Sequence, residues 1–419
     1  MKILYYSVVP WMHTGYATCT EEIATRLHNG EHEVAIQCLS AISDKKIIWH
    51  GEGSDCELDE PMTIYPSDSA FGLDDAKEAF MDFNADVMFT HFDTWLNPAR
   101  KKIPNYGVPY SSYAIVDHDP APEYVVEQLA GGVRNVSMSE FGKERLDDKG
   151  ERTVQIPHGV DTGEYYPLDE SDKPTVLEIR DNDGDVTELN IDRHFIFGMV
   201  AANHGSRKNI PAHMHAFKIF LEKVDDNAII MIHTEQNSHN GYNLREVQNE
   251  LDIPDSNLIW PRGEDYGEVG NEYLNSLYNS FDVFLNCSYG ESWGLTVTEA
   301  QAAGTPVIAS NFTALPEQLG VSQPDKENIE KVDEDVYRAP HGLVCDPSAP
   351  VWKQKVNSRQ YIVPPSTIFR AMKYYYNNKE EIIADGVRAS EYVSENYDWD
   401  DVVIPQFEDH FAELEELLT

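Results

Sequence analysis

Short apolar segments alternate with helical patterns along two long stretches of the sequence. The first stretch runs from KILYYS at residues 2–7 to TVQI at residues 153–156, and the second from FIFGMVAA at residues 195–202 to PVIAS at residues 306–310. Apolar strands separated by helices are typical of parallel sheets covered on both faces. A chain of 419 residues is also too long for one ordinary core. The sequence therefore predicts an α/β protein with two doubly wound, Rossmann-like domains.

The same alternation places the domain boundaries. We expect an N-terminal domain, a linker with a hairpin, and a C-terminal domain, at residues 1–170, 171–194 and 195–399. The hairpin should turn at Asp183-Gly184. An EF-hand would need its glycine at the sixth loop position, and here it is fourth from Asp181, so no calcium loop is predicted. Residues 359–378 are expected to be a helix that begins with prolines. Ligands of such sheets bind beyond the carboxyl ends of the strands, which predicts an active site in a cleft between the domains.

The chain is very acidic. It has 73 Asp and Glu against 32 Lys and Arg, which gives a net charge of −41. Such self-repulsion destabilises a fold unless salt screens it, and molar salt shortens the Debye length to roughly 3 Å. We interpret the charge as adaptation to a high-salt cytoplasm, or to an entity that replicates in one; the simpler alternative is an ordinary acidic protein. Either way, binding to nucleic acid through its phosphates is disfavoured.

Cysteine usage and hydropathy indicate a cytoplasmic protein. The five cysteines have no CxxC spacing, so we expect reduced thiols, and the pattern argues against zinc. Cys287 and Trp260 are expected in the core. The N-terminus lacks the apolar segment of a signal peptide, and no apolar run is long enough to predict a transmembrane segment.

Two glutamates flank a junction between a loop and a helix in GESWGLTVTEAQAAG at residues 290–304. Glu291 and Glu299 have seven residues between them. Free N–H groups at a helix start favour an anion, and three of them could hold a phosphate, those of Gly294, Leu295 and Thr296. Carboxylates beside a phosphate suit a neutral donor of hydrogen bonds such as a sugar hydroxyl. The spacing therefore favours a ligand of sugar, phosphate and ribose, unless Glu299 is only a helix-favouring acid.

Neutralising such a phosphate requires cations. Arg207 and Lys208 are adjacent in a chain poor in basic residues, and they precede a helix with Pro211 in its first turn. The alternative interpretation is a solvated surface pair.

These segments resemble the family 4 retaining glycosyltransferases, which have the GT-B fold. The family's Glu-x7-Glu region is matched by Glu291-Ser-Trp-Gly-Leu, Glu299-Ala, Gly304, Pro306-Val-Ile-Ala and Glu317. Three further family segments are resembled by residues 14–34, 136–146 and 156–167. The family's closing helix, which packs on the N-terminal domain, is resembled by residues 398–417, and we expect the helix itself at residues 400–419. The usual double glycine is reduced to Gly15, and Asn203 stands where the family has an arginine.

The resemblance implies a reaction and roles for these residues. Glu299 would hold the ribose hydroxyls of a nucleotide diphosphate sugar, a UDP- or GDP-sugar, and Glu291 the hydroxyls of its sugar. Lys208 and Arg207 would stabilise the departing diphosphate, so no metal cofactor is required. Gly15 and Asn203 are further candidates for donor contact. The acceptor would be a hydroxyl of a saccharide, a lipid-linked glycan or a nucleic acid.

The segment YAIVDHDPAP at residues 113–122 allows two interpretations. Asp117 and Asp119 match the Asp-x-Asp that binds Mg²⁺ or Mn²⁺ in the other large glycosyltransferase fold, which has one sheet domain. In the GT-B family a histidine after this strand points at the donor sugar, so we favour His118 as a catalytic residue. His91 and Asp93 are weaker candidates for the acceptor side.

Two other functions stay open from the sequence. The altered positions Asn203 and Gly15 also fit a GT-B protein that binds nucleotide sugars without turnover. A glycosyltransferase acting on modified nucleobases of DNA is the third, and the charge of −41 opposes it.

Overall fold

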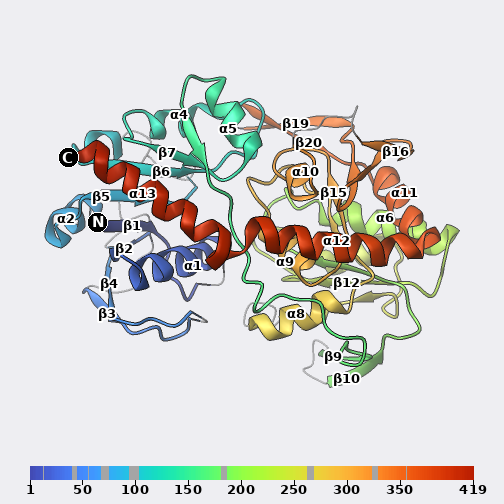
Figure 1. Ribbon diagram of the computed structural model, residues 1–419. Coiled ribbons are helices and arrows are strands. Elements are labelled where there is room, and N and C mark those ends of the chain that lie inside the picture. Colours follow the sequence, from blue (N-terminus) through green and yellow to red (C-terminus); the bar gives the residue numbers. More distant parts are fainter. Residues whose placement is uncertain are drawn as a thin grey trace. The chain divides into compact units, whose positions relative to one another are not determined.

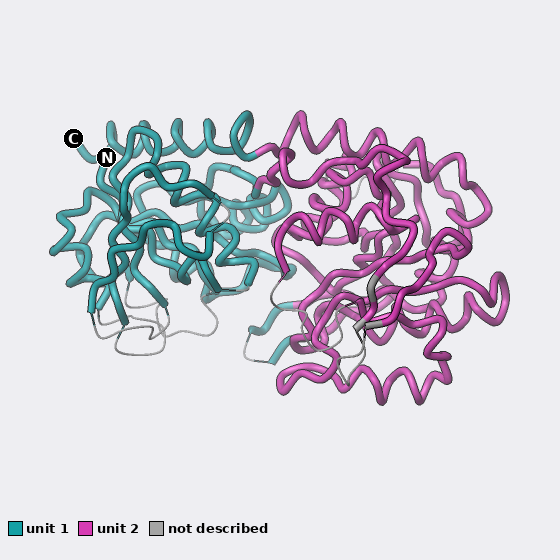
Figure 2. The backbone as a smooth tube through the Cα atoms, turned by 90° about the horizontal axis from the view of Figure 1, so that it is seen from below, with its two compact units in different colours: residues 1–158, 353–358, 399–419 teal, residues 159–352, 359–398 magenta. Residues whose placement is uncertain are grey.

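The computed structural model describes residues 1–12, 14–39, 45–54, 56–67, 75–93, 103–180, 186–261, 269–322, 329–354 and 356–419. The chain forms two compact units, which Figure 2 colours teal and magenta. Unit 1 comprises residues 1–158, 353–358 and 399–419, and unit 2 comprises residues 159–352 and 359–398. Each unit contains one eight-stranded sheet.

The sheet of unit 1 has the strand order β3-β4-β2-β1-β5-β6-β7-β8. Its strands are β1 (Lys2–Ser7), β2 (Glu33–Cys38), β3 (Ile47–Trp49), β4 (Met62–Tyr65), β5 (Val87–Thr90), β6 (Tyr110–Ala114), β7 (Asn135–Ser137) and β8 (Thr153–Gln155). β3 and β4 pair antiparallel, whereas the neighbouring pairs from β4 to β8 are parallel. The described helices of this unit are α1 (Gly15–Asn29), α2 (Ala76–Phe83), η2 (Ile103–Asn105), α4 (Glu123–Leu129), α5 (Glu140–Asp147), η3 (Trp399–Val403) and α13 (Ile404–Leu418).

Helix α13 covers part of this sheet (Figure 1) and contacts it through aromatic side chains. The rings of Phe407 and Phe411 lie 6.0 and 5.3 Å from the ring of Phe89 in β5, centroid to centroid. His410 Nε2 lies 3.2 Å from Ser111 Oγ of β6. Burying one phenylalanine side chain stabilises a fold by about 1.5–3 kcal/mol. Although α13 lies far from the sheet in sequence, it is therefore part of the core of unit 1.

The sheet of unit 2 has the strand order β13-β12-β11-β14-β15-β18-β17-β16. Its strands are β11 (Ile196–Val200), β12 (Ile229–His233), β13 (Leu258–Ile259), β14 (Val283–Asn286), β15 (Val307–Ser310), β16 (Glu330–Asp333), β17 (Val336–Ala339) and β18 (Gly342–Cys345). The described helices are α6 (Ile210–Lys223), α7 (Leu244–Glu250), α8 (Asn271–Asn279), α9 (Leu295–Ala302), α10 (Leu315–Gln318), α11 (Pro365–Asn377) and α12 (Lys379–Tyr397). Two small antiparallel pairs are formed by β9 (Val176–Arg180) with β10 (Val186–Asn190), and by β19 (Ala349–Lys353) with β20 (Ser358–Ile362).

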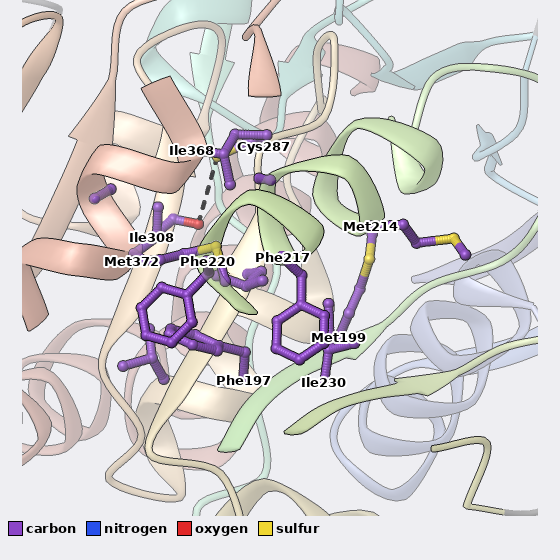
Figure 3. Close-up of a cluster of buried hydrophobic side chains, with 14 of the residues drawn as sticks. Phe197, Met199, Met214, Phe217, Phe220, Ile230, Cys287, Ile308, Ile368 and Met372 are labelled. Carbon is purple, nitrogen blue, oxygen red and sulfur yellow. Dashed lines mark hydrogen bonds between the residues drawn. The ribbon is translucent and has the colours of Figure 1, made fainter. Parts of the chain in front are cut away.

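The core of unit 2 lies between β11 and α6. Figure 3 shows Phe197, Phe217 and Phe220 close together, and the rings of Phe197 and Phe220 are 5.0 Å apart. On β11, Gly198 has no room for a side chain, because an added Cβ would lie 2.0 Å from the ring of Phe281. This packing fixes the strand whose carboxyl end leads to the arginine and lysine of the candidate site.

The predicted α/β class with two doubly wound sheets is confirmed, although five strands of the two sheets were not predicted: β3, β4, β16, β17 and β18. Cys287 and Trp260 are buried, as expected.

The hairpin strands β9 and β10 pair antiparallel, and the predicted turn at Asp183-Gly184 lies outside the described residues. The helix predicted over 359–378 is wrong in its first part, which is β20, because the helix cannot extend back through the prolines at its start. In the described part of the chain, no helix combines the length and apolar character that crossing a membrane requires. The cleft between the domains stays a prediction.

Candidate active site

The loop between β14 and α9 is shaped by a glycine. Gly294 has φ +128°, and a Cβ at this position would lie 3.3 Å from both Leu315 and Gln318. Helix α9 therefore begins at Leu295 after a turn that suits glycine alone. Among the described residues, no side chain accepts a hydrogen bond from the first N–H groups of this helix as an N-cap would.

Glu291 lies in this loop and is buried, with an exposed fraction of 5%. Its carboxylate accepts hydrogen bonds from Lys208 Nζ at 2.7 Å, from Ser288 Oγ at 2.9 Å and from Arg207 Nη1. Its backbone N–H donates to Thr313 Oγ1 at 2.9 Å. The carboxylate is thus fixed from several sides, and Arg207 and Lys208 are two of its partners.

Arg207 and Lys208 come from the loop between β11 and α6. Tyr289 N–H donates to the carbonyl of Arg207 at 2.8 Å, and Arg207 Nη1 donates to the carbonyl of Gly290 at 3.0 Å. These bonds join the two loops at the carboxyl ends of the neighbouring strands β11 and β14. The cations are therefore part of a bonded site and do not form a solvated surface pair.

The site carries one more positive charge than Glu291 balances. Burial acts to raise the pKa of Glu291, but the charges of Arg207 and Lys208 lower that pKa overall, so the carboxyl is ionised. Burial lowers the pKa of Lys208, and the charge of Glu291 opposes this change. Because two cations share one carboxylate, the cluster favours the approach of an anion.

Glu299 lies on α9 and is held by a different partner. Tyr278 OH, from α8, donates to Glu299 Oε2 at 2.5 Å. Burial raises the pKa of Glu299 to about 7, although the bond from Tyr278 and the charge of Lys208 act to lower it. Near neutral pH this carboxyl is therefore shared between its charged and uncharged forms, and it is close enough to Lys208 for their charges to interact.

A hydroxyl at the start of α9 is without a protein partner. Thr296 Oγ1 is buried and makes no hydrogen bond within the described residues. A buried polar atom without a partner is costly and often marks a ligand position. The sequence predicted this residue only through its backbone N–H. Sequence reasoning missed Ser288, Thr313 and Tyr278, and of these only Ser288 had a signal, its place three residues before Glu291.

Asn203 is used inside unit 2. Its amide donates to the carbonyls of Glu235 and Tyr242 at 2.9 and 2.7 Å and accepts from Tyr242 N–H at 2.9 Å. Gly241 makes room for it, because a Cβ there would lie 2.2 Å from the Asn203 carbonyl. Both donors and the acceptor of the side chain hold a neighbouring loop, so it does not replace the family's arginine as a cation.

Unit 1 holds the other predicted residues. His118 follows β6, and its Nδ1 donates to the carboxylate of Asp117, while its buried Nε2 has no hydrogen-bond partner among the described residues. Asp119 pairs with Arg145 at 3.6 Å, so each carboxylate of the Asp-x-Asp has its own partner. Gly15 begins α1, where Thr14 Oγ1 accepts from Ala17 N–H at 3.2 Å.

The candidates for the acceptor side differ in exposure. His91 is 1% exposed, and Tyr5 OH lies 3.0 Å from its Nδ1, whereas Asp93 is half-buried. Burial lowers the pKa of His91 to about 3, so its ring is neutral. A side chain so deeply buried is poorly placed to meet an acceptor.

The family model described as "Glycosyl transferases group 1" matches residues 195–323, which include both glutamates, Arg207 and Lys208. Over this region the chain is similar to the glycosyl transferases of group 1. A D-inositol 3-phosphate glycosyltransferase of Streptomyces scabiei is 48% identical to this chain over 48 residues. That match spans 12% of this chain and 11% of the relative, so it supports the group 1 region alone.

Solved structures extend the likeness to the whole fold. A sucrose-phosphate synthase from Thermosynechococcus elongatus has a TM-score of 0.70 and 15% identity, covering 99% of each chain. HepE of Anabaena, in complex with UDP-glucose, has a TM-score of 0.66 and 13% identity, covering 99% of this chain and 100% of its own. The group 1 region therefore belongs to a chain with the predicted GT-B fold.

Proposed function

We propose that this protein is a retaining glycosyltransferase that moves a sugar from a nucleotide diphosphate sugar to a hydroxyl acceptor without a metal ion. The observation that carries the proposal is the buried carboxylate of Glu291 between Arg207 and Lys208, beside the uncapped start of α9. The match of residues 195–323 to glycosyl transferases of group 1 supports the same class of reaction.

The cations act on the leaving group. When the bond between sugar and diphosphate breaks, negative charge accumulates on the phosphate oxygens. Arg207, Lys208 and the N–H groups at the start of α9 are held in place before the donor arrives, so they stabilise this charge without a cost of reorganisation. Removing one such group from an enzyme typically slows turnover about 100–1,000-fold.

Donor binding changes the partners of Glu291. The incoming diphosphate competes with the carboxylate for Arg207 and Lys208, and it carries more charge. Glu291 is still held by the hydrogen bond from Ser288 to its carboxylate and by the hydrogen bond from its backbone N–H to Thr313. Its carboxylate then accepts hydrogen bonds from hydroxyls of the donor sugar. The ion pairs with Glu291 therefore hold both cations in position for the phosphates.

Glu299 and Thr296 complete the donor site. Tyr278 holds one oxygen of Glu299, and the other accepts from the ribose hydroxyls. Thr296 Oγ1 donates to a phosphate oxygen, which satisfies an otherwise unpartnered buried hydroxyl. His118 of unit 1 stays a proposed catalytic residue, and the Asp117 carboxylate fixes its ring tautomer.

UDP-sugars are the first donors to test, followed by GDP-sugars, because a protein of similar fold was solved with UDP-glucose. We propose saccharides or lipid-linked glycans as acceptors. The experiment is a thermal-shift screen of UDP, GDP and their sugars, followed by measurement of transfer and of slow donor hydrolysis. Ligand binding raises the melting temperature by mass action.

The decisive variant is Glu291→Gln, with Glu222→Gln on the surface of α6 as the control. Glu291→Gln should keep the affinity for free UDP and lose turnover, whereas Glu222→Gln should behave as wild type. NMR of the anomeric proton in the product tests retention. Wild-type protein that neither transfers nor hydrolyses any donor in the screen would exclude the enzyme.

A nucleotide-sugar binding protein without turnover is the second candidate. The observation that favours it is Asn203, whose amide holds a loop at the position where the family has an arginine. Donor binding that survives Glu291→Ala, together with no turnover in wild type, would support this function.

A further inference from the structure

Three buried side chains that can ligate a metal meet inside unit 1. Cys19 lies on α1, His91 directly follows β5, and His158 follows β8. One potential ligand atom from each residue lies within 4.8 Å of those of the other two. In the described part of the chain, this is the one group of at least three His, Cys, Asp or Glu side chains with such geometry.

The tyrosine partner of His158 prepares its ring as a ligand. Tyr113 OH donates its single proton to the carbonyl of Ile156 at 2.8 Å. His158 Nδ1 lies 3.0 Å from the same hydroxyl oxygen, so Nδ1 must carry the proton and donate it. This leaves Nε2 of His158 with a lone pair. A second partner that fixes the tautomer in this way is usual for histidines that bind metals.

His91 has a nitrogen that the protein does not satisfy. Tyr5 OH lies 3.0 Å from His91 Nδ1, whereas Nε2 is buried and has no hydrogen-bond partner within the described residues. A packed core histidine would normally satisfy its second nitrogen, so the vacant position points to a ligand.

We propose that Cys19, His91 and His158 bind one Zn²⁺ ion. Zinc bonds of about 2.0–2.3 Å place neighbouring ligand atoms roughly 3.3–3.7 Å apart, which small rotations of these side chains can reach. One thiolate and two imidazoles suit zinc better than the hard cations Mg²⁺ and Ca²⁺. Binding removes the proton of the Cys19 thiol, which is released to solvent, and the site then has a net charge of +1. A water molecule takes the fourth position.

The zinc ion would connect parts of unit 1 that are distant in sequence. It would join the first turns of α1 to the residues that follow β5 and β8. The chain leaves unit 1 directly after His158. The dispersed cysteines argued against zinc because spacing rules detect only ligands that are close in sequence. Here the fold brings together ligands from three separate segments.

Cobalt provides a direct readout that needs no sugar donor. The full chain is stripped of metal with a chelator, kept reduced and titrated with Co²⁺ and then with Zn²⁺. Wild type should develop a thiolate-to-cobalt charge-transfer band that saturates near one equivalent, disappears on adding Zn²⁺ and is accompanied by release of about one proton. Zinc should also raise the melting temperature by a few degrees.

Matched variants identify the ligands. Cys19→Ser should abolish the band, whereas Cys38→Ser, which changes another buried cysteine of the same unit, should retain it. Tyr113→Phe should weaken zinc binding about 10–100-fold while keeping the band at saturating cobalt.

A wild-type protein without the band overturns the proposal even if the Cys19→Ser variant fails to fold. Equal zinc affinity in wild type and Cys19→Ser also overturns it, and binding of Cu⁺ alone overturns the choice of zinc. Since all these measurements are made without donor, they can fail or succeed independently of the glycosyltransferase activity.

Discussion

The two units have similar sheets but opposite ways of burying ionisable side chains at the ends of their strands. In unit 2, Glu291 is buried as an ion because Arg207 and Lys208 offset its charge. In unit 1, His91 and His158 are buried as neutral rings beside tyrosines. A buried charge needs an opposite charge, whereas a neutral imidazole needs only hydrogen-bond partners. The same topology therefore prepares unit 2 for an anion and leaves unit 1 with lone pairs suited to a cation.

Removing a cation from the ion pairs of unit 2 should have the largest effect on activity. With Lys208→Ala, kcat should fall about 100–1,000-fold, because one of the groups that stabilise the leaving diphosphate is lost. Lys218→Ala is the control, since Lys218 lies on α6 and contacts Glu222 at 3.5 Å away from the site. Steady-state kinetics with the best donor of the screen measures both. An equal kcat for the two variants would contradict the role of Lys208.

The next largest effect on kcat is expected from changing Asp117, whose carboxylate bonds to His118. Asp117→Asn removes the charge that fixes the Nδ1–H tautomer of His118, so kcat should fall about 10–100-fold with little change in KM. The matched control is Asp119→Asn, whose carboxylate pairs with Arg145. If Asp119→Asn has the larger effect, the Asp-x-Asp metal interpretation replaces the role of His118.

Glu299 links the pH dependence of stability to unit 2. Burial raises its pKa from 4.5 to about 7, so the folded protein holds this proton more tightly than the unfolded chain. The stabilisation it provides is fully present below pH 4.5 and is lost as the pH rises through 7. Relative to Glu299→Gln, the free energy of unfolding of wild type should therefore fall by about 1–3 kcal/mol between pH 5 and pH 8.

Urea unfolding at the two pH values measures this difference, and Glu222→Gln should follow wild type at both. A Glu299→Gln variant whose stability runs parallel to wild type across this range would show that burial does not perturb the carboxyl.

The smallest expected effect is on the affinity for UDP and concerns Thr296 at the start of α9. Thr296→Val preserves the shape of the side chain and removes the hydroxyl, so the affinity for UDP should fall about fivefold, equivalent to roughly 1 kcal/mol for one hydrogen bond. Calorimetric titration measures it, with Thr187→Val on the exposed strand β10 as the control. Unchanged affinity would mean that the hydroxyl does not face the phosphates.

Much of unit 2 was predictable because its signals are local. Apolar strands, Gly294 and the pair Arg207-Lys208 each lie within a few residues of the features they position. That Glu291 contacts both cations follows from parallel strands, whose carboxyl ends share one edge. The antiparallel strands β16 and β17 were missed, since their charged residues lack a continuous apolar run.

The unit 1 cluster and the role of Asn203 could not be predicted, because both depend on contacts between segments far apart in sequence. Nothing near His158 in the sequence indicates Tyr113 as its partner. Asn203 was assigned by alignment with an arginine, and only its three hydrogen bonds show that it holds a loop.

The position of α13 determines the order in which the protein can be completed during synthesis. The ribosome makes the first 158 residues early, but Phe407 and Phe411, which cover Phe89, emerge only after the whole of unit 2 has been translated. Residues 1–158 therefore wait with an uncovered apolar face, while residues 159–398 can already close the core of unit 2. A chaperone that shields this face would act on the segment that was made first.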